Sequence, residues 1–480
     1  MAEQKEEKRT LGFWVALSIV IGGVIGSGIF KNPASMAAEL QSGFWLIMVW
    51  VIAGVVSMFG ALTNAEIAGM IPATGGQFMF YKKVFGNFTG FMYGWAAFFV
   101  IQSGSAASIT YVFSEYTSTL IDLPRFDAVT EKSILLHIPY VGDFFPLENF
   151  GVKALTIGVI WLLTLINVRG AAMGGRVQIL FTALKLFAMV FIVGMVFGWG
   201  GNAHAVSSTI IDPIPIEGIT LAAFMAAIGG AFWGYDGWNN LTFVAGEVKN
   251  PQRNIARALF WGLIVVIAVY VIINLAYLYV LDINSMAKSV LVATDAVATV
   301  TGKAVIIVAL SIMISTFGAS NGTIMSSARI YFAMAREGLF FKSVGKLHPK
   351  FETPAISLIW AAVWSSVLVL SGTFDMLTGM LIFVAWIFYA LSAVSVIILR
   401  IREPKAERPY KVWGYPIIPL IFIVFSLVFL VVTLNNDIND YQAGKTQVVN
   451  SVFGLVIVAT GIPFYFLFKK SGGENDKIKT

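Results

Sequence analysis

The stretch 19-IVIGGVIGSGIF-30 decides the architecture, because it loads the first long apolar segment of the chain with four glycines. Glycine is a poor helix former, and each one in a helix interior costs about 1 kcal/mol relative to alanine. A continuous membrane helix would lose about 3–4 kcal/mol here, so we interpret the stretch as the unwound centre of a broken helix. Close packing against a neighbouring helix through small residues is the alternative explanation.

The composition is that of a protein that crosses a membrane many times. Of the 480 residues, 58% are hydrophobic and only 12% are charged. Apolar runs long enough to cross about 30 Å of hydrocarbon recur along the whole chain. We predict an all-α polytopic membrane protein with twelve transmembrane helices, at 12–36, 43–70, 88–120, 150–168, 175–198, 218–243, 258–281, 302–334, 353–371, 375–400, 414–433 and 448–469.

The distribution of basic residues predicts an orientation. Most of the 32 Lys and Arg residues fall on the side of the membrane that both termini share, and loops retained in the cytoplasm are enriched in these residues. We therefore expect residues 1–11 and 471–480 to be cytoplasmic tails of a multi-pass protein of the cell (plasma or inner) membrane. The net charge of +6 then reflects topology and requires no nucleic acid. The longest outer loop, 121–149, is expected to fold as a small cap.

A second glycine-rich interruption lies five predicted spans after the first. The segment 226-AAIGGAFWGYDGWNN-240 places four glycines around Asp236 in mid-membrane. Transporters built from inverted repeats carry such broken helices in pairs, one in each repeat. The pair predicts a first repeat over 12–198 and a second over 218–400, followed by two further helices within 401–470.

The two predicted breaks have complementary polarity. The first span runs outward, so the half-helix that begins near Ser27 and Gly28 presents free N–H groups and a positive dipole end, which suit a carboxylate. The sixth span runs inward, so its first half ends near Trp233 and Gly234 with unpaired carbonyls, which suit an ammonium group. A zwitterion fits both ends, and an α-amino acid is the simplest ligand of this kind.

Four other residues bear on the site. Lys185 lies near the bilayer midplane, about 14 Å beyond Arg176, and an intramembrane lysine usually has a partner and a function. We predict that it is a fixed or titratable charge beside the broken first span. Asp236 is expected to cap the inner half of the sixth span, to tune the pocket, or both. Trp233 is predicted to close the pocket, and Glu66 to pair with a basic neighbour.

Other classes of function find little support in the sequence. A membrane enzyme needs nucleophiles, acid–base groups or metal ligands inside the membrane, whereas the histidines all fall in predicted loops. A channel needs repeated carbonyl loops or rings of charge, and the sequence suggests neither. The chain has no cysteine, which excludes thiol chemistry. A carrier is the favoured class, with a non-transporting receptor or scaffold as another, and no cofactor or metal is expected.

Five segments resemble, in order, the signatures of the amino acid–polyamine–organocation (APC) transporters, and specifically the L-type amino acid transporter (LAT) family in its prokaryotic branch. The resemblance implies five plus five helices in an inverted repeat (a LeuT-like fold) with two more appended. It also implies sodium-independent exchange of L-amino acids by alternating access. The segments are 25-IGSGIF-30, 65-AEIAGMIPATGG-76, 233-WGYDGWNNLTFVAGEVKNPQRNIARAL-259, 315-STFGASNGTIMSSARIYFAMAREG-338 and 408-RPYKVWGYPIIPLIF-422.

The resemblance also implies roles for individual residues. Lys185 matches a lysine that links the first span to the eighth in place of a coupling ion, and Ser315 matches its partner there. Animal members carry a cysteine that joins a heavy chain, so its absence here argues against a heavy-chain partner. Substrate contacts match Ile25, Gly26, Ser27, Gly28, Trp233, Gly234, Asp236 and Asn239, with Trp233 as the gate.

We therefore predict an exchanger (antiporter) of L-amino acids, neutral ones rather than cationic ones. A proton-coupled amino acid symporter in which Lys185 titrates is the alternative. An exchanger that accepts cationic amino acids also stays open, because Asp236 replaces a glycine of the type that carries large neutral substrates. Membrane lipids are the other expected partners.

Overall fold

A computed structural model describes residues 9, 11–199, 218–301 and 305–476. Within these residues the chain is mostly helical, as expected, because backbone groups in hydrocarbon need internal partners. Nine helical segments of the described chain are long and apolar enough to span a membrane. They are α3 (Gly43–Met70), Asn87–Ser118 (α5, Asn87–Ala96; a π-helical turn, Ala97–Ile101; α6, Gln102–Ser118), α8 (Phe150–Val168), α9 (Ala171–Trp199), α13 (Pro251–Val280), α16 (Val305–Arg336), α18 (Phe374–Arg402), α19 (Ile417–Gln442), and α20 (Asn450–Ala459) with α21 (Gly461–Asp476).

Three further spans are interrupted or shorter. α1 (Phe13–Val24) and α2 (Gly28–Leu40) form one span that bends by 40° between them. α11 (Leu221–Tyr235) is followed, after a short non-helical segment, by α12 (Asn240–Phe243). Together with the apolar helix α17 (Ala355–Ser371), these elements give an arrangement that is consistent with the twelve predicted spans.

The sixth span is broken after Tyr235 and not at Trp233 and Gly234, where the sequence predicted it. Gly237 supplies the turn, with a φ of +101° that other residues rarely adopt. Gly234 stays helical, and its lack of a side chain leaves room for the ring of Trp50, which a Cβ would approach to 2.6 Å. Close packing therefore explains Gly234, whereas Gly237 breaks the helix.

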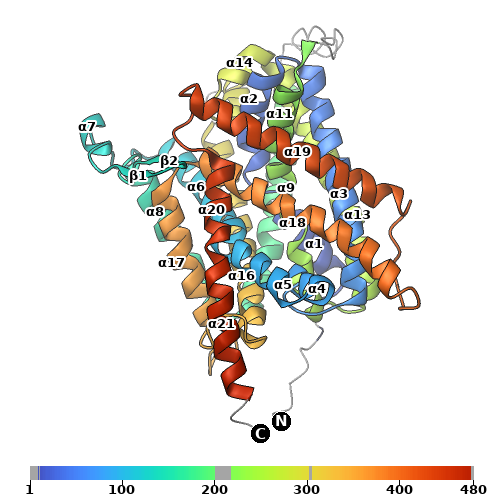
Figure 1. Ribbon diagram of the computed structural model, residues 1–480. Coiled ribbons are helices and arrows are strands. Elements are labelled where there is room, and N and C mark those ends of the chain that lie inside the picture. The colour runs from blue at the N-terminus through green and yellow to red at the C-terminus, as the bar shows by residue number, and fades with distance from the viewer. Residues whose placement is uncertain (1–8, 10, 200–217, 302–304, 477–480) are drawn as a thin grey trace.

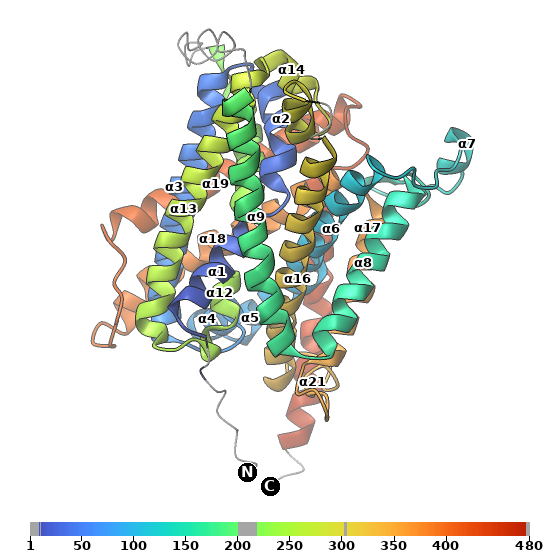
Figure 2. The same cartoon turned by 180° about the vertical axis from the view of Figure 1, so that it is seen from behind.

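The two interrupted spans lie at the centre of the bundle (Figure 1). α2 and α11 share the half of the molecule that carries α14 (Ile283–Lys288), and α1 lies in the opposite half, near α4 (Gln77–Phe85) and α5. Figure 2 shows α9 running between α13 and α16, on the side of the bundle where it faces α1. This helix thereby brings Lys185 to the broken first span.

The two ends of the bundle carry different structures. The upper end in Figure 1 carries α14 and α15 (Val292–Ala298), with a cap to one side. The cap consists of α7 (Ala128–Glu131) and the antiparallel strands β1 (Leu136–Ile138) and β2 (Gly142–Phe144), as expected for the loop 121–149. At the lower end lie α4, the start of α1, the end of α21 and the loop that joins α18 to α19.

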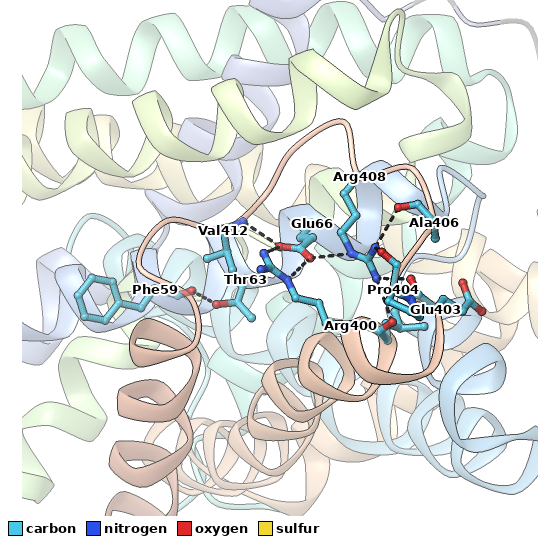
Figure 3. A network of polar contacts seen from close by, with 10 residues as sticks. Phe59, Thr63, Glu66, Arg400, Glu403, Pro404, Ala406, Arg408 and Val412 are labelled. Carbon is cyan, nitrogen blue, oxygen red and sulfur yellow. Dashed lines mark hydrogen bonds and ion pairs between the residues drawn. The ribbon is translucent and has the colours of Figure 1, made fainter.

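One buried carboxylate holds the loop between α18 and α19 against α3 (Figure 3). Glu66, only 1% exposed, accepts two hydrogen bonds from Arg400, at 2.7 and 2.9 Å. It also lies 3.4 Å from Nε of Arg408 and accepts a 2.8 Å bond from the backbone N–H of Val412. The prediction that Glu66 pairs with a basic neighbour is confirmed. Because the Arg408 side chain is itself nearly buried, water cannot solvate its charge. The Glu66 carboxylate balances that charge instead.

Replacement of Glu66 should strongly destabilise the protein. Glu66→Ala leaves Arg400 and Arg408 without their counter-charge, which costs about 3–5 kcal/mol of unfolding free energy when a buried pair is broken. Thermal unfolding in detergent measures the loss. As a control, Glu403→Ala removes an exposed pair with Lys83 and should cost less than about 1 kcal/mol. Equal losses in the two variants would show that Glu66 does not anchor the loop.

Candidate functional site

The break in the first span leaves polar backbone groups unpaired. α1 ends at Val24, the N–H of the next residue, Ile25, still bonds to Ile21, and α2 begins at Gly28. Within the described chain, no hydrogen bond is recorded from the backbone N–H groups of Gly26, Ser27 or Gly28. The Ser27 hydroxyl is buried, does not cap α2 and has no partner among the described residues. The start of α2 therefore offers free donors and a positive dipole end.

The two breaks touch each other through glycines. A Cβ on Gly28 would lie 2.6 Å from Cα of Gly234, and one on Gly237 would lie 2.6 Å from the carbonyl oxygen of Gly23. No larger residue fits at these contacts without displacing backbone. A Cβ on Gly26, in contrast, meets nothing closer than 3.9 Å. Gly26 thus faces open space where the other glycines face backbone.

That space is a cavity between the two breaks, α6 and α16. Gly26, Ser27, Trp233 and Asp236, which the sequence singled out, all contribute to its wall. The other wall residues are Gly23, Val24, Gln102, Ser105, Ile109, Gly237, Asn240 and Thr323. The cavity is therefore bordered by unwound backbone on one side and by small, mainly polar side chains on the other.

Sequence reasoning missed the contribution of α6. Gln102, Ser105 and Ile109 follow the i, i+3, i+7 spacing of one helix face, and a polar residue on that face of an apolar span was an available signal. Their register also depends on the π-helical turn Ala97–Ile101 directly before them, a feature that often marks functional sites. The apolar sequence of this turn contains no pattern that predicts a π-helical conformation.

Four of the predicted site residues do not line the cavity. Gly28 and Gly234 pack against each other. Ile25 presents its carbonyl to Lys185, and the Asn239 amide donates a 3.1 Å hydrogen bond to Gln77.

Asn239 belongs instead to a polar layer below the cavity. Its partner Gln77, at the start of α4, also accepts a hydrogen bond from Tyr93 at 2.8 Å and donates one to Ser392 at 3.2 Å. Tyr81 bonds to the same serine hydroxyl at 2.7 Å. This layer ties the sixth span to α4, α5 and α18 on the side toward the lower end of the bundle.

Asp236 does not cap the inner half of the sixth span. The residue before α12 is Asn239, which makes no side-chain cap, and Asp236 instead ends α11. Its carboxylate accepts a 2.7 Å hydrogen bond from the Tyr389 hydroxyl of α18. The reason for the difference is that the turn at Gly237 carries the carboxylate away from the start of α12. Asp236 thus places a carboxylate at the cavity wall.

Lys185 lies beside the broken first span, as was predicted from its position near the bilayer midplane. The side chain is fully buried, and Nζ donates to the carbonyl oxygens of Gly22 at 2.9 Å and Ile25 at 2.5 Å. These carbonyls end α1, where a cation is favoured by the helix dipole. The expected link to Ser315 is not made: its hydroxyl is buried without a partner in the described chain.

Tyr270 is a second residue at the breaks, and sequence reasoning missed it. Its hydroxyl, buried in α13, lies 3.0 Å from the carbonyl oxygen of Val24 and 2.8 Å from that of Gly234. The Gly234 carbonyl, which was expected to await an ammonium group, therefore already has a partner from the protein. One hydroxyl hydrogen serves two carbonyls, since a phenol has a single donor.

Trp233 separates the cavity from a second pocket toward the upper end. It is 5% exposed, lines both spaces, and meets the ring of Phe374 edge-on at 6.0 Å between centroids. Lys31 lies 4.8 Å from the same Phe374 ring and forms an ion pair with Glu115 at 2.5 Å. An aromatic pair and an ion pair thus close this side of the cavity.

The chain is similar to amino acid transporters over almost its whole length. A family model described as amino acid permease matches residues 11–461. The serine/threonine exchanger SteT of Bacillus subtilis (strain 168) is 31% identical over 471 residues, which cover 96% of this chain and 97% of that protein. The b(0,+)-type amino acid transporter 1 of Homo sapiens is 29% identical over 467 residues (96% and 88%). The large neutral amino acids transporter small subunit 2 of Mus musculus is 31% identical over 474 residues (96% and 81%).

Two glycines in the same break should respond differently to one added methyl group. Gly28→Ala places a Cβ against the backbone of Gly234 and should lower the free energy of unfolding by about 1–3 kcal/mol, the usual cost of overpacking. Gly26→Ala places its Cβ in open space and should leave stability unchanged. Thermal unfolding of both variants in the same detergent checks this. A Gly28→Ala protein as stable as the Gly26→Ala protein would contradict the glycine contact between the breaks.

Proposed function

The chain belongs to the amino acid permease family of the APC superfamily, and from this premise we propose that it is a sodium-independent exchanger of neutral L-amino acids. The observation that carries the proposal is the cavity between two unwound segments. One segment offers free N–H groups, and the other brings the carbonyl end of a helix and a carboxylate. A molecule with a carboxylate and an ammonium group on the same carbon atom matches that arrangement. As a member of a transporter family, the chain has no need of a catalytic step.

In this proposal the α-carboxylate lies at the start of α2. The N–H groups of Gly26, Ser27 and Gly28 and the Ser27 hydroxyl are free to donate to it. Backbone donors at a helix N-terminus are well suited to anions. Because backbone N–H groups bind the α-carboxylate, recognition of the carboxylate does not depend on the substrate side chain.

The ammonium group lies toward the end of α11 in this proposal. The carbonyls of Ile25, Trp233 and Gly234 are close to the breaks, and a carbonyl oxygen can accept a second hydrogen bond. The Asp236 carboxylate at the cavity wall adds negative charge on this side. Asn239 acts in the polar layer below and does not touch the substrate in this state.

The wall opposite the breaks favours a neutral side chain. Gln102, Ser105, Ile109 and Thr323 carry no charge, and the Asp236 carboxylate lies on the side of the cavity assigned to the ammonium group. A cationic side chain would need a free carboxylate in this wall to replace its hydration. The match with a serine/threonine exchanger and a large neutral amino acids transporter subunit supports neutral substrates.

Alternating access follows from the two closed sides of the cavity. We propose that Trp233 gates the upper side and that the layer around Gln77 and Asn239 opens on the lower side. The repeats 12–198 and 218–400, each with one broken helix, would supply the moving parts, with 401–470 appended at the periphery. Lys185 takes the place of a coupling cation by holding the carbonyl end of α1.

The same premise supports an orientation in the membrane. The chain is an integral multi-pass membrane protein, and we propose that the lower end in Figure 1 faces the cytoplasm, with both termini there. Basic residues gather at that end, as they do in cytoplasmic loops. We also propose that it works without a disulfide-linked heavy chain, because it has no cysteine.

The exchange mode can be tested in proteoliposomes. Vesicles preloaded with unlabelled serine or leucine should take up the labelled amino acid, and empty vesicles should not, with or without sodium. Competition by all twenty amino acids then defines the substrate range. Uptake that needs no internal amino acid but follows a pH gradient would replace the exchanger by the proton-coupled symporter.

Replacement of Lys185 should abolish exchange while the protein still folds. Lys185→Ala frees the carbonyls of Gly22 and Ile25 and removes the cation beside the break, so we expect at least about a hundredfold loss of exchange rate, or roughly 3 kcal/mol. Lys153→Ala is the matched control, because this buried lysine also donates to backbone carbonyls, at Phe145, but far from the cavity. Near-normal exchange by Lys185→Ala, or an equal loss in both variants, would remove the proposed coupling role.

A further inference from the structure

A groove unrelated to the substrate cavity opens at the lower end of the bundle. It lies between the first turns of α13 and the loop that joins α18 to α19, and it encloses about 1170 Å³, part of it open to the outside. We call it the headgroup groove. Its lining residues are Leu62, Gln252, Arg253, Ala256, Arg257, Phe260, Trp261, Pro409, Tyr410 and Trp413.

One wall of the headgroup groove carries two arginines without a counter-charge. Arg253 and Arg257 are both exposed and stand one helical turn apart on α13, so their side chains project from the same face. Neither forms an ion pair or a side-chain hydrogen bond with any described residue. Nearby arginines behave differently, since Arg329 pairs with Glu247 and Arg400 with Glu66. The groove therefore presents a double positive charge that the described protein does not neutralise.

The opposite wall is fixed and largely aromatic. Glu66 holds the backbone of this loop at Val412 (Figure 3). The next residue, Trp413, is 62% exposed and contacts Phe260 of α13 at 5.5 Å between ring centroids. On α13 itself, Trp261 packs against Phe260 and is 53% exposed. The Tyr410 hydroxyl is buried there without a partner among the described residues.

The groove lies at the level where a bilayer changes from hydrocarbon to headgroups. Two spanning helices begin at its edge, α13 at Pro251 and α19 at Ile417. Tryptophans at the ends of spans favour this interfacial level, because the ring is apolar and its N–H is polar. Exposed arginines and exposed aromatic rings in the same groove match a molecule with an anionic head and an apolar tail.

We propose that the headgroup groove binds an anionic phospholipid of the membrane leaflet at this end. The phosphate accepts hydrogen bonds from Arg253 and Arg257, whose guanidinium groups suit the geometry of phosphate oxygens. The upper part of an acyl chain packs on Phe260, Trp261 and Trp413. The proposal rests on the membrane location of the chain and is independent of which amino acid it carries.

Lipid retention by the purified full-length chain tests the proposal. Phosphatidylglycerol or phosphatidylcholine is added to protein in detergent, and bound lipid is counted by native mass spectrometry. We expect retention of phosphatidylglycerol and little of phosphatidylcholine. The double variant Arg253→Ala/Arg257→Ala should weaken phosphatidylglycerol binding by about 30-fold, given the usual contribution of a basic residue near an anionic lipid surface. Arg253→Lys/Arg257→Lys should keep most of the binding.

A matched control removes the same charge elsewhere on the same end. Lys342→Ala/Lys346→Ala deletes two exposed lysines of the loop after α16 and should retain phosphatidylglycerol as the unmodified protein does. Glycerol 3-phosphate, a free phosphate without acyl chains, should not displace the lipid. Amino acid exchange by each variant shows that the variant is folded. Lipid retention and amino acid exchange are measured independently, so a failure of the exchanger proposal is distinguished from a failure of the lipid proposal.

Three results would overturn the proposal. If the unmodified protein retains no phosphatidylglycerol, the groove is not a phospholipid site. If both double alanine variants lose lipid equally, binding reflects the overall charge of this end and no groove. Displacement by glycerol 3-phosphate alone would reassign the site to a soluble phosphate.

Discussion

The contact between two glycine-lined breaks is the constraint on which the rest of the structure depends. In hydrocarbon, unwound backbone is tolerated only where protein or a polar cavity shields it. Gly28 against Gly234 and Gly23 against Gly237 bring the two breaks so close that each shields the other. The surrounding helices then need to supply only a few polar side chains to the breaks. These side chains come from α9, α13 and α18.

Those groups divide the shared space by charge. Lys185 places a cation at the carbonyl end of α1, and Asp236, held by Tyr389, places a carboxylate near the end of α11. Between them lie Gly26 and Ser27, which line the cavity just before α2. The site thus has a donor side and an acceptor side, which is the arrangement that a zwitterion requires and that a simple hydrophobic pocket lacks.

Features that depend on single residues in an unusual setting could be predicted from the sequence. Four glycines in an apolar run marked the first break, a lysine at mid-membrane marked its neighbour, and Glu66 at a span end implied a basic partner. Each of these residues has a free-energy cost in its local setting, and a contact with another part of the protein must offset that cost. The substrate roles of the individual residues stay predictions, because geometry alone does not test them.

Features set by tertiary packing could not be predicted. Gly234 and Gly237 look alike in the sequence, and only the ring of Trp50 and the carbonyl of Gly23 decide which one stays helical. The side chain of Asn239 donates to Gln77 of a helix distant in sequence, and the Ser315 hydroxyl has no partner among the residues that the structure describes. The cavity wall on α6 was missed because a π-helical turn sets its register.

The shared hydrogen of Tyr270 has a consequence for the empty protein. A single hydroxyl stands between the carbonyls of Val24 and Gly234, so at any instant one of them lacks its full hydrogen bond. A bound ammonium group brings three hydrogens and removes this shortage. The unloaded protein is then the less satisfied one, and reorienting without cargo would carry that shortage through the whole movement. In the proposed exchanger this deficit would favour the return of the loaded carrier over the return of the empty one.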